Sequence, residues 1–285
     1  MVNMIKFLYG CLIWYFFMER TDFMNIIVCV KQVPGTNKVD IDPVTGTMKR
    51  DGVSSKMNPY DLFALECALE LAEQNGGSVK TLSMGPPQAK AVLEESLCMG
   101  ADEGLLLSDR AFGGADVLAT SYCLSLGVKK FGDFDLVLCG KQTTDGDTAQ
   151  VGPELAERLG IDHAANVLKI DAIDDKFVTV TIDLDGIEQT QKMALPCLLT
   201  LEKDANTPRL PSYLKKKAIR PEQISVCSSK DFPDANMGML GLKGSPTQVE
   251  RIFPPAVNTE QSMLSGTPDE LACQLRDLLV AEKFI

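Results

Sequence analysis

The chain has 285 residues, 45% of them hydrophobic and 24% charged, which is the composition of a globular protein with one large domain or two smaller ones. Its net charge of −11 argues against a nucleic-acid binder, because such proteins are usually basic. Nine cysteines without a C-x-x-C pair indicate reduced thiols in a cytoplasmic protein, and the single histidine, His163, argues against a histidine-rich metal site or a Ser-His-Asp triad.

The first 23 residues differ from the rest of the chain. Phe7 to Met18 is an apolar and aromatic run of 12 residues, too short to span a bilayer, and no small-residue cleavage site follows it. At Met24 an apolar segment begins that is typical of the first strand of an α/β domain. We therefore expect residues 1–23 to be a leader derived from upstream sequence, without membrane contact; a membrane anchor is the weaker alternative.

From Ile26 to Leu159, apolar strands alternate with segments of helical periodicity. The expected strands are Ile26–Val30, Val79–Met84, Gly104–Ser108 and Leu136–Cys139. The expected helices begin at Pro59, Gly85, Ala115 and Thr148, and a hairpin is expected at residues 39–50. Repeated strand–helix units predict an α/β fold with a parallel, doubly wound sheet.

The loop after the fourth strand, residues 140–151, is here called the cradle loop. It is made of glycine, small and polar residues and leads from a buried strand into a helix. Free amides and the helix dipole at such a point attract a phosphate, and ligands of open α/β sheets bind at the carboxyl ends of strands. The loop is neither a P-loop nor a G-x-G-x-x-G motif, so an ordinary strand–helix connection stays open.

A second candidate for the same edge of the sheet is the helix start at Asn58. Asn58 suits the N-cap, Pro59 the first helical position, and Asp61 the first turn. Capping alone would explain these residues. The ends of the strands at Cys29–Lys31 and Met84 could line one crevice with the cradle loop.

The pattern changes after Leu159. Residues 177–193 alternate about an Asp-Gly turn and predict a hairpin, and residues 196–201 predict a strand that returns to the sheet. Residues 203–211 are expected to form an exposed loop, and Lys215–Lys217 a solvated face or a contact with an acidic partner. Residues 219–266 indicate an extended arm, and an amphipathic helix starts at Thr267.

From Met24 to its end, the chain closely resembles the beta subunit of electron-transfer flavoproteins. The resemblance is carried by short motifs in matching order: Val30–Pro34, Met57–Pro59, Gly85–Pro86, Met99–Asp102, Gly140–Gln142 with Asp145–Asp147, and Leu195–Pro196 followed by Pro208–Arg209 and Lys215–Lys217. Residues 31–36, 42–47 and 146–153 resemble the electron-bifurcating branch, which holds two FAD molecules.

The resemblance implies a sheet of the adenine-nucleotide-alpha-hydrolase-like type and a heterodimer with an alpha subunit. It divides the chain into a leader at 1–23, an α/β nucleotide-binding domain at 24–218, and a C-terminal arm and helix at 219–285 that dock on the partner. The implied cofactor-binding residues are Cys29, Asn58, Pro59, Tyr60, Asp61, Met84, Gly140, Lys141, Gln142, Thr143, Thr144, Asp145, Gly146, Asp147, Thr148, Ala149, Gln150 and Val151. The amides of residues 148–151 are expected near the phosphates, and Cys29, Asn58 and Met84 nearer the adenosine.

The implied function is electron transfer through FAD bound to this subunit, with NADH as donor. The electrons would pass to the FAD of the alpha subunit, and on to an acyl-CoA dehydrogenase, and to ferredoxin or flavodoxin. No catalytic side chain and no metal are required, because the flavin carries the redox chemistry. Two alternatives stay open: a respiratory-type subunit that holds AMP in place of FAD, and a stand-alone ATP-binding stress-type module.

Overall fold

The computed structural model describes residues 24–35, 55–250 and 263–285. The expected leader and the hairpin at residues 39–50 lie outside the described residues. Contacts between residues divide the chain into two units, and the described parts of these units are residues 24–250, with the gap after residue 35, and residues 263–285.

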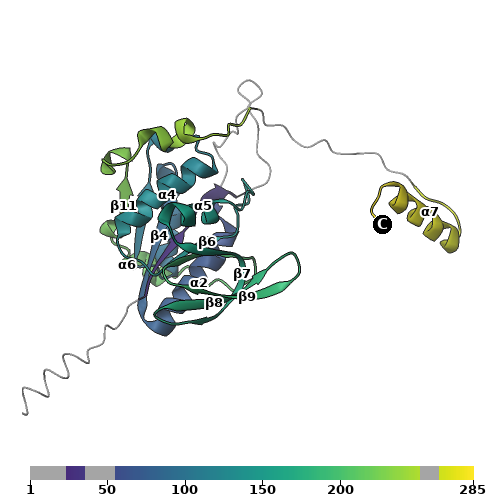
Figure 1. The fold of residues 1–285 in the computed structure, drawn as a ribbon, viewed down its shortest axis with the longest axis horizontal. Helices are drawn as coiled ribbons and strands as arrows, with labels where there is room; N and C mark the ends of the chain where they lie inside the picture. Colours follow the sequence, from purple (N-terminus) through teal and green to yellow (C-terminus); the bar gives the residue numbers. More distant parts are fainter. Residues whose placement is uncertain (1–23, 36–54, 251–262) are drawn as a thin grey trace, which may run out of the picture. The chain divides into compact units, whose positions relative to one another are not determined.

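The first unit is built on a sheet whose described strands number nine, in the order β11-β5-β4-β1-β6-β10-β7-β8-β9 (Figure 1). Neighbouring strands are parallel from β11 to β7 and antiparallel from β7 to β9. The strands are β1 (Met24–Cys29), β4 (Gly77–Met84), β5 (Glu103–Leu107), β6 (Leu136–Gly140), β7 (Asp162–Ile173), β8 (Phe177–Asp183), β9 (Glu188–Ala194), β10 (Cys197–Leu201) and β11 (Ile224–Cys227). The predicted α/β class with a largely parallel sheet is confirmed.

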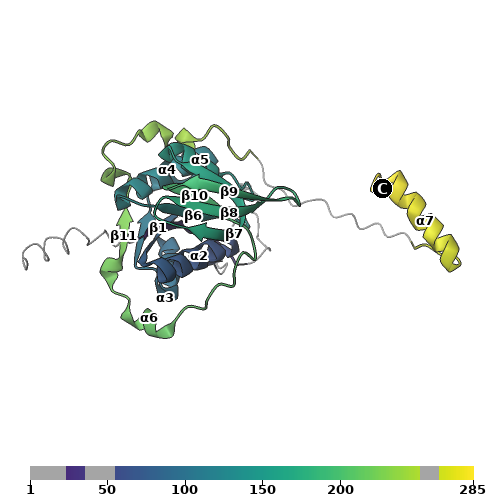
Figure 2. The same cartoon turned by 60° about the horizontal axis from the view of Figure 1, so that its bottom comes forward.

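Helices cover both faces of the sheet, as Figure 2 shows. On one face lie α2 (Pro59–Asn75) and α3 (Lys90–Met99), and on the other α4 (Val117–Phe131) and α5 (Val151–Leu159). Central strand β1 supplies both cores, because Ile26 packs on the α2 side and Ile27 on the α4 side. Because β1 is buried on both faces, its residues from Ile26 to Cys29 are all apolar and show no alternation.

The chain changes direction along the sheet at β1. It first adds β4 and β5 on one side of β1, and then returns through α4 to place β6 on the other side. The connections that leave β1 and β6 therefore diverge at the carboxyl edge of the sheet. Such a switch point is where open α/β sheets hold their ligands.

A small antiparallel ribbon begins at the end of β1. It pairs β2 (Gln32–Pro34) with β3 (Ser55–Met57), so that Gln32 lies opposite Met57. The next residue, Asn58, donates its backbone N–H to the carbonyl of Lys31 at 2.9 Å. The ribbon thus holds the start of α2 beside the end of β1.

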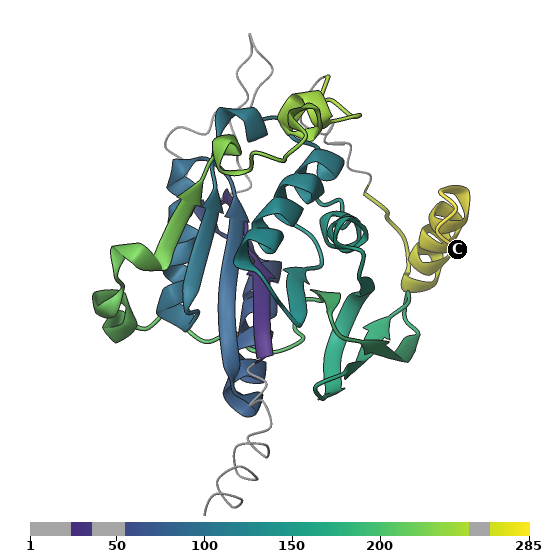
Figure 3. The same ribbon diagram turned by 60° about the vertical axis from the view of Figure 1, so that its left-hand side comes forward.

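The segment from Ile219 to Glu250 packs on the α/β unit over much of its length. In Figure 3, β11 is the green strand at the edge of the sheet, and it pairs with β5. Farther along, Leu240 and Ser245 are buried. The weak periodicity predicted an arm, but a four-residue strand and short turns are too brief to show a period.

The 3₁₀ segments are η1 (Pro87–Ala89), η2 (Arg110–Phe112), η3 (Pro221–Gln223), η4 (Ser229–Asp231), η5 (Met237–Met239) and η6 (Gly241–Gly244), and the short helix α6 is Tyr213–Ala218.

The second unit contains helix α7 (Pro268–Ala281), which begins at the predicted place. Thr267 and Glu270 form a capping box, in which each side chain accepts a hydrogen bond from the backbone N–H of the other residue. Along one side of α7, Leu275 and Leu278 are exposed. Among the described residues, none of the helices combines the length and apolar character needed to cross a membrane.

Candidate functional site

The predicted site residues lie at the carboxyl edge of the sheet, around the ends of β1, β4 and β6. Cys29, at the end of β1, lies opposite Leu82 of β4 and Cys139 of β6. Met84 ends β4 and Gly140 ends β6. The structure therefore brings together segments that are more than 100 residues apart in the chain.

Asn58 and Asp61 attach the cradle loop to the start of α2. The carboxylate of Asp61 accepts hydrogen bonds from the backbone N–H of Lys31 at 2.7 Å and from the side-chain amide of Asn58 at 2.8 Å. That amide also donates to the carbonyl of Gln142 at 2.9 Å, and the Asn58 side-chain carbonyl accepts from the N–H of Thr144 at 3.2 Å. Asn58 occupies the N-cap position but makes no side-chain capping bond, so its side chain serves the loop.

Asp61 is 4% exposed, and burial raises its pKa to about 7, although the hydrogen bonds from Asn58 and Lys31 oppose this shift. Gly140 makes this arrangement possible. A Cβ atom at position 140 would lie 2.5 Å from Oδ1 of Asp61 and 2.7 Å from the backbone of Tyr60. The loop therefore starts at a point where only glycine fits between the strand and the helix.

The cradle loop turns twice through the left-handed region before α5 begins. Asp147 has φ 54° and Ala149 has φ 55°. The sequence pattern predicted that helix α5 starts at Thr148. Because of these two residues, it starts at Val151. The loop is closed earlier by bonds to Thr143, which accepts from the N–H of Asp147 at 2.9 Å and, through its hydroxyl, from that of Gly146 at 3.3 Å.

The amides at the end of the cradle loop are available to a ligand. Within the described residues, the backbone N–H groups of Thr148, Ala149, Gln150 and Val151 make no hydrogen bond. The partial positive charge of the α5 N-terminus adds to theirs. Free amides near a helix start form a site for a phosphate.

A cleft of about 770 Å³ lies beside the loop. It shares Met84 and Asp145 with the predicted site and extends toward the ends of β4 and β5. Lys31, which was expected to line this crevice but not to bind the cofactor, is also part of its wall. Other residues of the wall were not predicted; they include Gln32, Gln88, Ser108, Arg110 and Phe112. The position of Lys31 directly after strand β1 was a signal for it, whereas no motif marks Arg110.

Two further predicted site residues, Lys141 and Tyr60, make side-chain contacts with neighbouring segments. Lys141 forms an ion pair with Glu202, which follows β10, at 3.1 Å. Tyr60 accepts a weak hydrogen bond from the side chain of Gln142 through its hydroxyl, at 3.5 Å. Lys141 therefore joins the cradle loop to the loop after β10.

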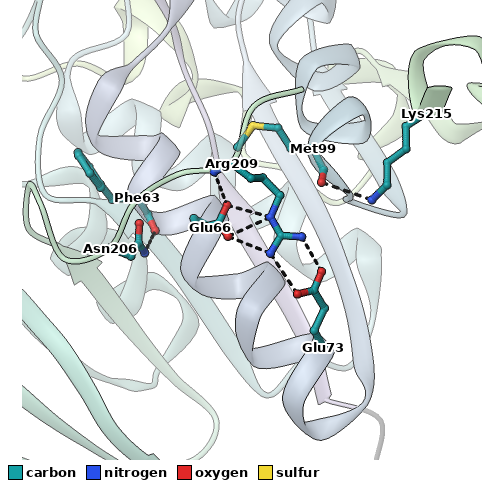
Figure 4. Close-up of polar contacts among 7 residues, drawn as sticks. All are labelled: Phe63, Glu66, Glu73, Met99, Asn206, Arg209 and Lys215. Atoms are coloured by element: carbon teal, nitrogen blue, oxygen red, sulfur yellow. Dashed lines mark hydrogen bonds and ion pairs between the residues drawn. The ribbon is translucent and has the colours of Figure 1, made fainter. Parts of the chain in front are cut away.

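Helix α2 also holds the loop at residues 203–211, which the sequence predicted to be exposed. Figure 4 shows Arg209 between Glu66 and Glu73 of α2, with Glu66 at 2.8 Å. The backbone N–H of Arg209 donates to the same Glu66 carboxylate at 2.8 Å, and Asn206 donates to the carbonyl of Phe63 at 2.8 Å. One helix thus supports both the cradle loop, at its start, and this second loop, along its length.

Comparisons with known proteins find close relatives over nearly the whole chain. Residues 45–228 match the family described as the electron transfer flavoprotein domain. The chain is 45% identical to the electron transfer flavoprotein subunit beta of Clostridium acetobutylicum over 262 residues, which are 92% of this chain and 100% of that protein. It is 47% identical to the caffeyl-CoA reductase-Etf complex subunit CarD of Acetobacterium woodii, over 86% of this chain and 93% of that protein. It is also 41% identical to protein FixA of Azorhizobium caulinodans, over 92% of this chain and 94% of that protein.

Proposed function

This chain belongs to the electron transfer flavoprotein family as a beta subunit, and from that premise we propose that it binds FAD at the cradle loop and its cleft. In a heterodimer with the alpha subunit, it passes electrons from NADH to the FAD of that subunit. Further acceptors in the proposal are ferredoxin or flavodoxin, and an acyl-CoA dehydrogenase that receives electrons from the alpha subunit. In this proposal, the electron transfer takes place in the cytoplasm.

The observation that carries the proposal is the set of amides of residues 148–151 at the switch point of the sheet. They match the oxygen acceptors of a diphosphate, and the dipole of α5 complements its charge. The cleft of about 770 Å³ is within the usual range for sites that take large organic ligands. These free amides support a site for the diphosphate of FAD.

The residues have separate tasks in this proposal. Thr148–Val151 bind the diphosphate through backbone amides, while Asn58 and Asp61 fix the loop that presents them. Cys29 and Met84 lie on the side of the adenosine. When bound, FAD would supply the redox chemistry, taking up the two electrons of one hydride and releasing them one at a time; the protein supplies position and electrostatics.

The C-terminal helix has a separate role in the proposal. Within the second unit, Leu275 and Leu278 of α7 are exposed on one side of the helix. An amphipathic helix needs an apolar surface to cover that side. We propose that the alpha subunit provides it, and that residues 219–285 include the main attachment to the partner.

Mass spectrometry of the cofactors released from the purified heterodimer tests the proposal. Two FAD molecules per heterodimer are expected. One FAD and one AMP would assign the respiratory role, in which the nucleotide of this subunit is structural. A chain that purifies without an alpha subunit and binds only ATP would favour the stand-alone module and overturn the proposal.

A further inference from the structure

An ion pair joins the end of β1 to the cradle loop. The ammonium of Lys31 lies 2.7 and 3.0 Å from the two carboxylate oxygens of Asp145. Both residues line the cleft, and their side chains are 43% and 23% exposed. The pair therefore spans two of the segments between which a ligand would enter.

The backbone of Lys31 is fixed although its side chain reaches into a partly open site. Its N–H donates to Asp61 at 2.7 Å, and its carbonyl accepts from the N–H of Asn58 at 2.9 Å. The side chain alone can therefore change partner without disturbing β1 or α2. A flexible lysine on a rigid base is suited to such an exchange.

The present partner of Lys31 is replaceable. Ion pairs of this exposure stabilise a protein by about 1 kcal/mol or less. A diphosphate carries more charge than a carboxylate and accepts stronger charge-assisted hydrogen bonds. Lys141, the other lysine near the loop, is already paired with Glu202. Lys31 lines the cleft and contacts the cradle loop through Asp145, so it is placed to compensate the charge of a phosphate bound at that loop.

We propose that Lys31 is a phosphate-binding residue that leaves Asp145 when the diphosphate of a nucleotide binds at the cradle loop. Asp145 holds the lysine before the ligand arrives, and competes with the ligand for it. This inference rests on the proposed nucleotide site, but not on the identity of the nucleotide or on electron transfer. It makes the charge of Lys31 important for diphosphates and unimportant for uncharged nucleosides.

The test is calorimetric titration of ADP and adenosine into the heterodimer after removal of its beta-subunit nucleotide, with the alpha-subunit FAD retained. Lys31→Met keeps the length of the side chain and the backbone bonds but removes the charge. It should weaken ADP binding by roughly tenfold, the loss of one charge-assisted hydrogen bond. Adenosine affinity should stay within about twofold, which also shows that the site is folded. Lys31→Arg should restore most of the ADP affinity.

Asp145→Asn is the matched variant, because it removes the competitor and not the cation. It should tighten ADP binding by a few fold, as expected for release of a pair worth up to about 1 kcal/mol. Equal ADP affinity in wild-type protein and Lys31→Met would overturn the inference, as would a loss of ADP affinity in Asp145→Asn. Failure of wild-type protein to bind ADP at all would instead refute the nucleotide site itself.

Discussion

The side-chain amide of Asn58 lies 2.8 Å from the carboxylate of Asp61 and 2.9 Å from the carbonyl of Gln142, so one amide joins the start of α2 to the cradle loop. Asn58 is fully buried. A buried polar group that loses its partners costs about 1–3 kcal/mol. The geometry of the candidate site thus depends on a residue whose local sequence pattern a helix cap alone would explain.

Asn58→Ser separates these two roles. Serine is as good an N-cap as asparagine, so the variant should keep its stability if Asn58 merely begins the helix. Serine is too short to reach both Asp61 and the cradle loop, so we expect a loss of about 1–3 kcal/mol in urea unfolding. Reduced nucleotide content after purification of the heterodimer should accompany it. Unchanged stability and nucleotide content would contradict the role assigned to Asn58.

Asp61 should make stability depend on pH. Its pKa rises from an ordinary 3.8 to about 7 in the folded protein, so between these values the folded state holds more protons than the unfolded state. Unfolding free energy should therefore fall as pH rises from about 4 to 7, by at most about 1.4 kcal/mol per pH unit. Asp61→Asn cannot ionise and should gain stability relative to wild type over that range. Thermal unfolding of the ligand-free wild-type protein and of Asp61→Asn measures the stability of both between about pH 4 and 7. If the stability of the two proteins changes with pH in the same way, Asp61 does not cause the pH dependence.

Gly140→Ala should disrupt the candidate site by steric conflict. The added Cβ would lie 2.5 Å from Asp61 and 2.7 Å from Tyr60, and neither can withdraw easily, because both belong to the first turn of α2. We expect a loss of roughly 1–3 kcal/mol and of bound nucleotide. Gly238→Ala is the control, since its Cβ would meet only the side chain of Asn236, at 3.2 Å. Its unfolding midpoint and cofactor content should match those of wild type.

Arg209 should contribute more to the free energy of unfolding than its position in a loop suggests. Arg209→Met leaves the buried carboxylate of Glu66 without its cation, and uncompensated buried charges cost about 3–5 kcal/mol. Glu73→Gln removes the other partner, whose side chain is 61% exposed, and should cost less than about 1 kcal/mol. Urea unfolding of the two variants measures the difference. Similar losses for both would show that the two acids contribute equally.

The proposed attachment of α7 can be tested without removing it. Leu275→Glu together with Leu278→Glu places charge on the exposed apolar side, and should reduce recovery of the alpha subunit in co-purification. Arg276→Gln changes a neighbouring exposed residue between them in sequence and should leave that recovery unchanged. If the leucine variants assemble normally, α7 does not carry the partner contact.

Sequence patterns predicted the elements whose burial is regular. The apolar strands and helix α2 follow from local periodicity, and the ends of the strands indicated the edge of the sheet at which the predicted site residues lie together. Strand β7 was not predicted, because its register shifts against β8 and Asn166 has φ 56°, so its residues do not alternate. The later start of α5 has a similar cause in Asp147 and Ala149.

Contacts between distant segments could not be predicted. Arg209 and Glu66 are 143 residues apart, and Lys31 and Asp145 are 114 apart. The sequence pattern placed Arg209 in an exposed loop, and it placed Lys31 and Asp145 at one edge of the sheet, but it indicated neither ion pair. Their roles depend on the order of strands in the sheet, which decides which loops meet.

The cross-strand neighbours Cys29 and Cys139 affect how readily the thiols of the protein are oxidised. The hydrogen bond with Cys29, together with burial, raises the pKa of Cys139 well above its usual value. Peroxides attack thiolates, so this sulfur is protected from oxidation. Among the cysteines of the described residues only Cys273 is exposed, so among these thiols oxidation should start at Cys273 on helix α7 and spare Cys29 and Cys139 in the sheet.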